Sequence, residues 1–283
     1  MQAVAFIINP NSAKGNYHSF LSQCQALMPK AIYHISKSLE DTQQFIQDHF
    51  ETVKIFVAVG GDGTISSVAQ ALIHTDKILG IYPAGSGNGF AKETHFNKDL
   101  HQLINKIKQQ QYKSIDTFKV NDHFSINVSG VGFDGLVAKN FEQTSRGFLN
   151  YIKVCIKTFF SYQPITIKFL DQDYQSFSGK YLMFNCANTR QFGNNAYIAP
   201  QALQDDGKLE MVLVNKFPVW YAPIFVARLF SKTMKADQFV TYLSTANLTF
   251  ETEGNDWHLD GEHTVIPSPI QIEVLPKSLN ILI

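Results

Sequence analysis

The sequence is poor in cysteine and has no excess of charge of either sign. Its 283 residues include three cysteines, Cys24, Cys155 and Cys186, which are far apart and form no C-x-x-C pair. This pattern favours a reducing compartment over a disulfide framework. Lysine plus arginine and aspartate plus glutamate both total 24, so the formal net charge is zero. We therefore expect no broad binding to nucleic acid.

Long apolar runs and processing signals are also missing. No stretch of about 20 apolar residues occurs, so we expect no segment that crosses a bilayer. The first residues, "MQAVAFIINPNS", lack a basic region and a cleavage site and instead predict a first strand. Hydrophobic residues make up 45% of the chain, which is enough for a large core. Together these features predict a cytoplasmic protein.

The first part of the chain alternates between strand and helix patterns. An apolar run at 55–59 predicts a buried strand, and Ile65, Val68, Ala69, Leu72 and Ile73 then recur with helical spacing. This order of strands and helices predicts a doubly wound α/β domain with a parallel sheet covered on both faces. The other expected strands are 3–8, 31–35 and 78–82, and the other expected helices are 17–28, 39–50 and 97–110.

From about residue 112, short strands follow one another instead. Turns such as "DDGK" and "EGND" separate several of them, and helical stretches near 136–160 and 219–234 interrupt the series. This texture predicts a largely antiparallel β domain. We place the two domains at 1–121 and 122–283, and the last strand is free to return to the first domain.

Three loops rich in glycine, serine and asparagine follow predicted parallel strands. They are "NPNSAKG" at 9–15, "GGDGT" at 60–64 and "PAGSGNG" at 83–89. In such sheets, ligands bind beyond the carboxyl ends of the strands. Glycine lets the backbone approach a phosphate group, and the N–H groups that begin a helix attract anions. The three loops therefore predict a phosphate-binding edge.

Two further patterns need separate treatment. The segment 130–135, "GVGFDG", fits G-x-G-x-x-G, but it lies in the β region with no parallel strand after it, so we do not assign it to a dinucleotide. The chain also lacks the G-x-x-x-x-G-K-[ST] phosphate loop. Asp62 has two interpretations, because the residue could cap a turn or helix, or could order Mg²⁺ and accept a hydroxyl proton.

Several segments, in this order, resemble the diacylglycerol kinase and sphingosine kinase superfamily. They are "NPNSAKG", "VAVGGDGTISSVAQAL", "GIYPAGSGNGFAKE", "SIDTFKVNDHFSINVSGVGFDGLV", "NCANTRQFGNNAYIAPQALQDDGKLEMVLV" and "HLDGEHTVIPSPIQIEVLPKSLNILI". The resemblance implies an α/β domain like that of NAD kinases, followed by a β-sandwich, with the active site in the cleft between them. It also implies ATP-dependent, Mg²⁺-dependent phosphorylation of a lipid hydroxyl.

The resemblance also assigns roles to individual residues. Asp62 would act near Mg²⁺, together with Asp116 through ordered water. Asp206, with backbone carbonyls near Leu203 and Lys208, resembles a second, structural metal site. The implied nucleotide contacts are Asn9, Gly60, Gly61, Gly63, Thr64, Gly85, Ser86, Gly87 and Asn88.

The proton acceptor is left between two carboxylates. The resemblance makes Asp260 of "LDGE" the general base with Glu262 in support, but Asp62 competes for the same role. From the residues alone, Asp260-Gly261 is also a strong hairpin signal. Arg146 is a candidate phosphate clamp or a solvated helix charge. Asp134 is a candidate contact for the lipid head group.

A lipid substrate requires access to a membrane surface. The segments 151–162 and 219–232 mix aromatic, aliphatic and basic residues, as interfacial helices do, although helices packed on a sandwich look similar. We expect one of them to make a transient, peripheral contact at the inner face of the membrane. A homodimer is left open.

Other functions account for less of the sequence. An NAD kinase would share "GGDGT", but the chain has no Asn-Glu pair of the kind that grips the ribose in those enzymes. A nucleotide-binding regulatory protein without turnover predicts defects among Asp62, Asp116, Asp260 and Glu262, all of which are present. A lipid carrier leaves the three loops unexplained. Diacylglycerol, monoacylglycerol, a sphingoid base and a phosphatidylglycerol-type lipid remain open as substrates.

Overall fold

The computed structural model divides the chain into two compact units. It describes residues 3–12, 17–85, 87–144 and 148–283. Unit 1 comprises Met1–Asp116 together with Pro276–Ile283, and unit 2 comprises Thr117–Leu275. The sequence predicts a boundary near residue 121 and leaves the last strand free to return to the first domain.

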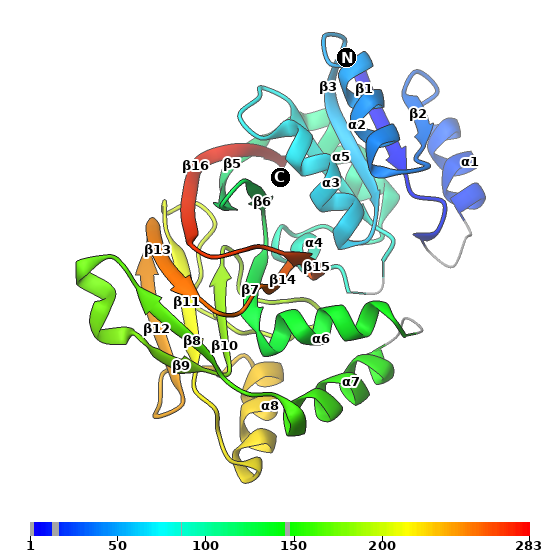
Figure 1. Cartoon of the computed structure of the whole chain (residues 1–283). Helices are drawn as coiled ribbons and strands as arrows, with labels where there is room; N and C mark the ends of the chain where they lie inside the picture. Colours follow the sequence, from blue (N-terminus) through cyan, green and yellow to red (C-terminus); the bar gives the residue numbers. More distant parts are fainter. Residues whose placement is uncertain (1–2, 13–16, 86, 145–147) are drawn as a thin grey trace. The chain divides into compact units, whose positions relative to one another are not determined.

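Unit 1 is built on a parallel sheet in the order β2-β1-β3-β4 (Figure 1). The strands are β1 (Ala3–Ile8), β2 (Ile32–Ile35), β3 (Val53–Gly60) and β4 (Ile78–Pro83). The end of β16 (Ile270–Leu282) continues this sheet, because Asn280 and Ile281 pair in parallel with Ile78 and Leu79 of β4. The chain therefore contributes its last residues to the unit in which it begins.

The composition of β3 explains why helices must cover this sheet. Its side chains from Ile55 to Val59 are buried on both faces, as expected for a central parallel strand. Five α-helices lie in the described part of this unit. They are α1 (Tyr17–Leu27), α2 (Leu39–Asp48), α3 (Asp62–Leu72), α4 (Gly89–Glu93) and α5 (Leu100–Gln109).

The helix predicted after the glycine turn is confirmed. All five residues with helical spacing, Ile65, Val68, Ala69, Leu72 and Ile73, are buried. The helix predicted at 97–110 begins later, at Leu100, because the Asp99 carboxylate accepts hydrogen bonds from the backbone N–H groups of His101 and Gln102 and caps α5.

Unit 2 contains two antiparallel sheets. One has the order β12-β11-β10-β7-β14-β15, and in the other β16 is followed by β13, β8 and β9. The strands are β6 (His123–Ser125), β7 (Val128–Gly132), β8 (Ile165–Phe169), β9 (Gly179–Tyr181), β10 (Met183–Ala187), β11 (Leu209–Val214), β12 (Val240–Thr245), β13 (Asn247–Thr252), β14 (Asp256–Leu259) and β15 (Glu262–Val265), and β5 (Tyr112–Val120) enters from unit 1.

Large aromatic side chains fill the space between the two sheets. Phe250 of β13 lies 5.0 Å from Phe184 of β10 and 6.3 Å from Trp257 of β14, measured between ring centroids. Phe169 of β8 completes this fully buried cluster. Such pairs stabilise a core beyond the apolar area they bury. The observed arrangement is the predicted β-sandwich.

Among the described residues of unit 2, three α-helices accompany the sandwich, together with short 3₁₀ helices at Gln172–Phe177 and Val219–Tyr221. The stretch predicted as one helix at 136–160 contains two, α6 (Phe133–Glu142) and α7 (Phe148–Ser161). The stretch predicted at 219–234 contains α8 (Ala222–Ser231) after a 3₁₀ turn, with Pro223 in its first turn.

The last strand offers a matched test of this architecture. Ile281 is fully buried beside β4, whereas Ile283 is 46% exposed. We expect Ile281→Ala to lower the free energy of unfolding by about 2–5 kcal/mol. Ile283→Ala should change it by less than about 0.5 kcal/mol. Urea unfolding followed by circular dichroism measures both, and equal losses would contradict the packing of β16 in unit 1.

Candidate active site

The turn after β3 and the loop after β4 meet at a contact between backbones. The N–H groups of Ala84 and Gly85 donate to the Gly60 carbonyl at 2.7 and 3.2 Å. A Cβ atom on Gly85 would lie only 2.4 Å from the Cα atom of Gly61. Any side chain at position 85 would therefore force the two loops apart, which explains the glycine at that position.

Helix α3 starts at this junction. Its N-cap is Gly61, whose extended backbone offers no side chain to the N–H groups of the first turn. Gly63 lies in that turn. Backbone N–H groups at a helix start, combined with the helix dipole, bind anions such as phosphate. The junction therefore combines close backbone access with donors suited to a phosphate.

Asp62, the third residue of the "GGDGT" turn, reaches across to another helix. Its Oδ1 atom accepts a hydrogen bond from the backbone N–H of Phe90 in α4 at 3.3 Å. The carboxylate thus connects the "GGDGT" turn to the segment that follows the "PAGSGNG" loop. This contact goes beyond the helix cap or local turn that the sequence offered as the simpler interpretation of Asp62.

The first loop joins the same turn through Asn9. The Asn9 Nδ2 atom donates to Thr64 Oγ1 at 2.9 Å, and its Oδ1 atom accepts from the Asn11 N–H at 2.9 Å. The Thr64 side chain also covers Gly60, where an added Cβ would lie 2.4 Å from Thr64 Oγ1. Two of the predicted nucleotide contacts, 55 residues apart, are therefore in direct contact.

Asn88 supplies a buried polar atom that lacks a protein partner. It adopts a left-handed backbone, with φ of 51°, and its Nδ2 atom donates to the Gly85 carbonyl at 2.8 Å. Its Oδ1 atom is buried and accepts no hydrogen bond within the part of the chain that the structure describes. Buried acceptors are nearly always satisfied, so this oxygen fits a ligand donor. Gly87 lies just before it, and Ser86 lies outside the described residues.

Asp116 and Asp206 occupy contrasting surroundings. Asp116 is fully buried in β5, and its Oδ1 atom accepts from the Lys277 N–H at 2.7 Å. Asp206 is exposed, and its Oδ1 atom accepts from the Lys208 N–H at 3.1 Å, beside Gly207 with φ of 75°. Among the described residues, no three His, Cys, Asp or Glu side chains form a group that could hold a metal. Both metal roles stay predictions.

The hairpin predicted at Asp260-Gly261 is confirmed. Leu259 of β14 pairs with Glu262 of β15, and the two residues between them have φ values of 53° and 98°. Positive φ at both central positions is the backbone of a two-residue type I′ turn, which favours Asp-Gly. The turn by itself, however, does not explain why the Asp260 side chain is buried.

Hydrogen bonds from one distant segment surround the Asp260 carboxylate. Its Oδ1 atom accepts from Ser125 Oγ at 2.6 Å and from the Asn127 N–H at 2.8 Å. The Ile126 N–H contacts both carboxylate oxygens at 3.2 Å. These donors occupy lone pairs of the carboxylate oxygens that a general base would use to accept the proton of a substrate hydroxyl. Glu262, in contrast, is exposed.

Asp134 belongs to a second buried polar cluster. Gly130 of β7 pairs with Asn185 of β10 on one side and with His258 of β14 on the other. Because Gly130 has no side chain, the Asp134 carboxylate from α6 can occupy the space above it. A Cβ on Gly130 would lie 2.4 Å from Asn185 Oδ1 and 2.7 Å from Asp134 Oδ2.

The contacts in this cluster define its proton positions. His258 Nε2 lies 3.1 Å from Asp134 Oδ2 and 3.4 Å from Asn185 Oδ1. Two facing acceptors require the proton on Nε2, which donates to the carboxylate. Burial raises the pKa of the Tyr162 phenol and of the Cys186 thiol, and the charge of Asp134 adds to both shifts.

Two members of this cluster, Asn185 and His258, were not among the residues predicted from the sequence.

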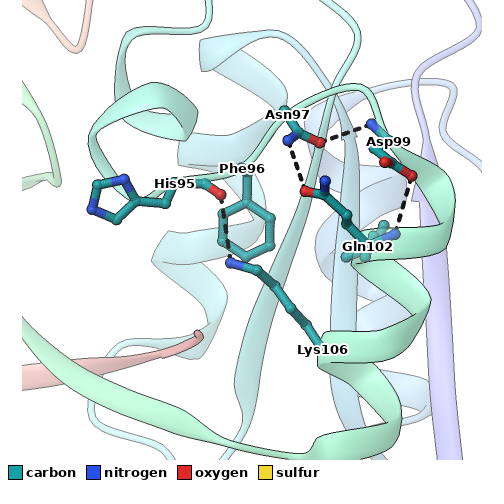
Figure 2. A pocket seen from close by; sticks show the side chains of 7 residues that line it. His95, Phe96, Asn97, Asp99, Gln102 and Lys106 are labelled. Atoms are coloured by element: carbon teal, nitrogen blue, oxygen red, sulfur yellow. Dashed lines mark hydrogen bonds between the residues drawn. The ribbon is translucent and has the colours of Figure 1, made fainter.

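Unit 1 has a surface pocket at the start of α5, away from the junction of Gly61 and Gly85 in the sequence. Figure 2 shows His95, Phe96 and Lys106 on one side of it and Asn97, Asp99 and Gln102 on the other. Its polar groups bind one another, since Asn97 Nδ2 donates to Gln102 Oε1 at 2.8 Å and Lys106 Nζ lies 4.4 Å from the centre of the Phe96 ring. These contacts belong to the start of α5 rather than to the glycine junction.

Comparisons with known proteins match both parts of the chain. Residues 3–120 match the family described as diacylglycerol kinase catalytic domain, and residues 127–283 match the YegS C-terminal NAD kinase beta sandwich-like domain. The chain belongs to the YegS-like, diacylglycerol kinase-like family of lipid kinases.

Individual relatives of this lipid kinase family agree. A protein of Staphylococcus haemolyticus, named as a lipid kinase, is 26% identical over 83% of this chain and 78% of its own length. A Pectobacterium atrosepticum protein, named as a YegS-like lipid kinase, is 26% identical over 79% and 76%. A Bacillus anthracis structure titled as a diacylglycerol kinase shares the fold, with a TM-score of 0.79, 20% identity and coverage of 99% and 96%.

The close contact between Gly61 and Gly85 predicts that alanine at the two positions has effects of different size. Gly85→Ala places a Cβ 2.4 Å from Gly61 Cα, whereas Gly61→Ala places one 3.2 Å from Gly85 Cα. Overpacking of this kind costs about 1–3 kcal/mol. We expect Gly85→Ala to weaken ATP binding by about tenfold or more, and Gly61→Ala to weaken it less. Isothermal titration with Mg-ATP measures both, and unchanged affinity in Gly85→Ala would contradict the assignment.

The two carboxylates of the hairpin yield a second prediction. Asp260→Ala leaves the backbone N–H groups of Ile126 and Asn127 without an acceptor in a buried site, and the Ser125 hydroxyl keeps only Ser129 Oγ as a partner. Each such group costs about 1–3 kcal/mol, so unfolding should become easier by about 3 kcal/mol or more. The exposed Glu262→Ala should cost less than about 1 kcal/mol. Thermal unfolding compares the two, and similar melting temperatures would contradict an anchoring role for Asp260.

Proposed function

We propose that this chain is an ATP-dependent lipid kinase that transfers the γ-phosphate of Mg-ATP to a lipid hydroxyl. The observation that carries the proposal is the junction between Gly61 and Gly85, where backbone meets backbone at the start of α3. The buried Asn88 Oδ1 atom beside it accepts no hydrogen bond from any residue that the structure describes. Membership of a lipid kinase family supports the same reaction class.

Unit 1 supplies the groups for the nucleotide. The N–H groups at the start of α3 would receive the phosphates, and Asn88 Oδ1 would accept a hydrogen bond from an amino or hydroxyl group of ATP. Asp62 is the residue that would hold Mg²⁺, with Asp116 acting through water. A bound Mg²⁺ supplies charge neutralisation on the phosphates. The Asn9–Thr64 hydrogen bond fixes the shape of the turn that receives them.

Phosphoryl transfer also requires an acceptor for the proton of the lipid hydroxyl. We propose Glu262 for this role, because its side chain is exposed while the Asp260 carboxylate accepts several hydrogen bonds. Asp260 then acts as a positioning residue that holds the hairpin carrying Glu262. Asp62 remains the alternative acceptor, since it lies at the phosphate junction itself.

Two further residues have proposed roles, Asp134 at the lipid and Arg146 at the phosphates. Asp134 is proposed to meet the lipid head group, with the His258 hydrogen bond fixing its carboxylate. Arg146, the proposed phosphate clamp, lies outside the described residues. Diacylglycerol, monoacylglycerol, a sphingoid base and a phosphatidylglycerol-type lipid are all candidate acceptors, so the assay must include all four.

The direct test is transfer of labelled phosphate from Mg-ATP to these four lipids in mixed micelles, with NAD as a control acceptor. We expect label in at least one lipid. Loss of a general base costs about 10²–10⁴-fold in rate, so Glu262→Gln should fall by this amount without loss of thermal stability. Asp62→Asn should also inactivate the enzyme. Labelled NAD, or no labelled product with any acceptor, would contradict the proposed function.

A second comparison separates the two acidic candidates. If Glu262→Gln retains its rate and Asp62→Asn loses it while both stay folded, Asp62 is the proton acceptor. If Asp260→Asn loses activity only in proportion to its folded fraction, the positioning role of Asp260 is supported. A folded Asp260→Asn protein with no activity, beside an active Glu262→Gln, would return the role of base to Asp260.

A further inference from the structure

Two helices of unit 2 expose large apolar side chains to solvent. Phe160 of α7 is 68% exposed, and Trp220, just before α8, is 63% exposed. The other exposed apolar residues of these segments are Tyr151, Ile152, Ile156, Val219, Ile224, Val226 and Phe230. Large exposed apolar patches mark interaction surfaces.

The end of α7 and helix α8 share one aromatic support and meet near that end (Figure 1). The ring of Phe159 in α7 stacks on Phe217 at 5.3 Å, and Phe217 stacks on Phe225 of α8 at 5.2 Å. Lys216 Nζ also donates to the Tyr162 carbonyl at the end of α7, at 3.1 Å. The inner faces are thus held on the sandwich, which leaves the outer faces uncovered.

Helix α7 carries two parallel stripes on its outer face. Ile152, Ile156 and Phe160 follow one another at intervals of four residues and form an apolar stripe. Lys153 and Lys157, both exposed, form a basic stripe one position further along. Neither lysine has an ion-pair partner among the described residues. The helix therefore presents apolar and cationic surface together.

Helix α8 has an apolar outer face, and its charged side chain is held by hydrogen bonds to neighbouring residues. The one charged residue of α8 itself, Arg228, donates to Asp237 Oδ2 at 2.5 Å and to the Tyr221 hydroxyl at 3.0 Å, so it does not charge the outer face. Burial opposes ionisation of Asp237, but hydrogen bonds from Tyr221, Phe239 N–H and Arg228 outweigh it and lower its pKa. Exposed Lys232 and Lys235 follow the helix.

Charge decides which partner fits this surface. The segments 148–162 and 216–236 contain no aspartate or glutamate, while they contain Lys153, Lys157, Lys216, Lys232 and Lys235. A symmetric contact with a second copy would place the same patch on itself and bring lysines together without acidic partners. An anionic lipid surface instead offers negative charge to the lysines and an apolar layer to the aromatic side chains.

We propose that the outer faces of α7 and α8 form a peripheral docking surface for anionic bilayers, with Phe160 and Trp220 entering the head-group region. No described helix is long and apolar enough to cross a membrane, so the contact is interfacial. The proposal deepens the proposed function, on which it rests for the reason that a lipid kinase must reach its substrate in a membrane.

The test is flotation with vesicles of phosphatidylcholine, with and without phosphatidylglycerol. We expect wild type to float with the anionic vesicles and much less with the neutral ones. The double variant Phe160→Gln/Trp220→Gln should lose about tenfold or more in affinity. Lys153→Gln/Lys157→Gln should lose about fivefold per lysine. The matched control is Leu170→Gln, which removes an apolar side chain that is 40% exposed elsewhere in unit 2, and it should float like wild type.

Further measurements keep this test separate from the kinase assay. The variants should keep the wild-type melting temperature and, on a short-chain lipid dispersed without vesicles, the wild-type rate. Flotation needs no activity, so it decides the docking surface even if no lipid is phosphorylated. The proposal is overturned if wild type does not float with anionic vesicles, or if both double variants float as well as wild type. It is also overturned if sedimentation shows a dimer that the aromatic variant disrupts while its flotation stays at the wild-type level.

Discussion

The approach of Gly61 to Gly85 is the constraint on which the phosphate-binding edge depends. Two loops that follow neighbouring parallel strands can touch through their backbones only if neither carries a side chain at the contact. That contact fixes where α3 begins and lets Asp62 reach the Phe90 N–H of α4. The groups proposed to bind ATP are thus arranged by packing that excludes side chains.

Unit 2 uses the same device in an antiparallel sheet. Gly130 stands between Asn185 and His258, and its missing side chain makes room for the Asp134 carboxylate. The Asp260 carboxylate is satisfied by Ser125, Ile126 and Asn127, which fixes the hairpin turn that precedes Glu262. In both units a catalytic proposal therefore depends on acidic side chains whose partners are backbone groups or buried polar residues.

Local patterns in the sequence predicted local structure well. The buried face of α3 followed from its helical spacing, and the Asp-Gly hairpin followed from turn chemistry. The donors around Asp260 lie more than 130 residues away, and the partner of Asp134 is 124 residues distant. Such contacts depend on strand register, which no local pattern encodes. His258, two positions before Asp260 in the sequence, was not among the predicted site residues.

The most direct test of the account is a crystal structure with a non-hydrolysable ATP analogue and Mg²⁺. The account predicts phosphates at the N–H groups that begin α3, between the Gly60–Thr64 turn and the loop containing Gly85. It also predicts that Asn88 Oδ1, which has no partner within the described part of the chain, accepts a hydrogen bond from the nucleotide. A nucleotide bound elsewhere, with this junction empty and Asn88 unchanged, would contradict it.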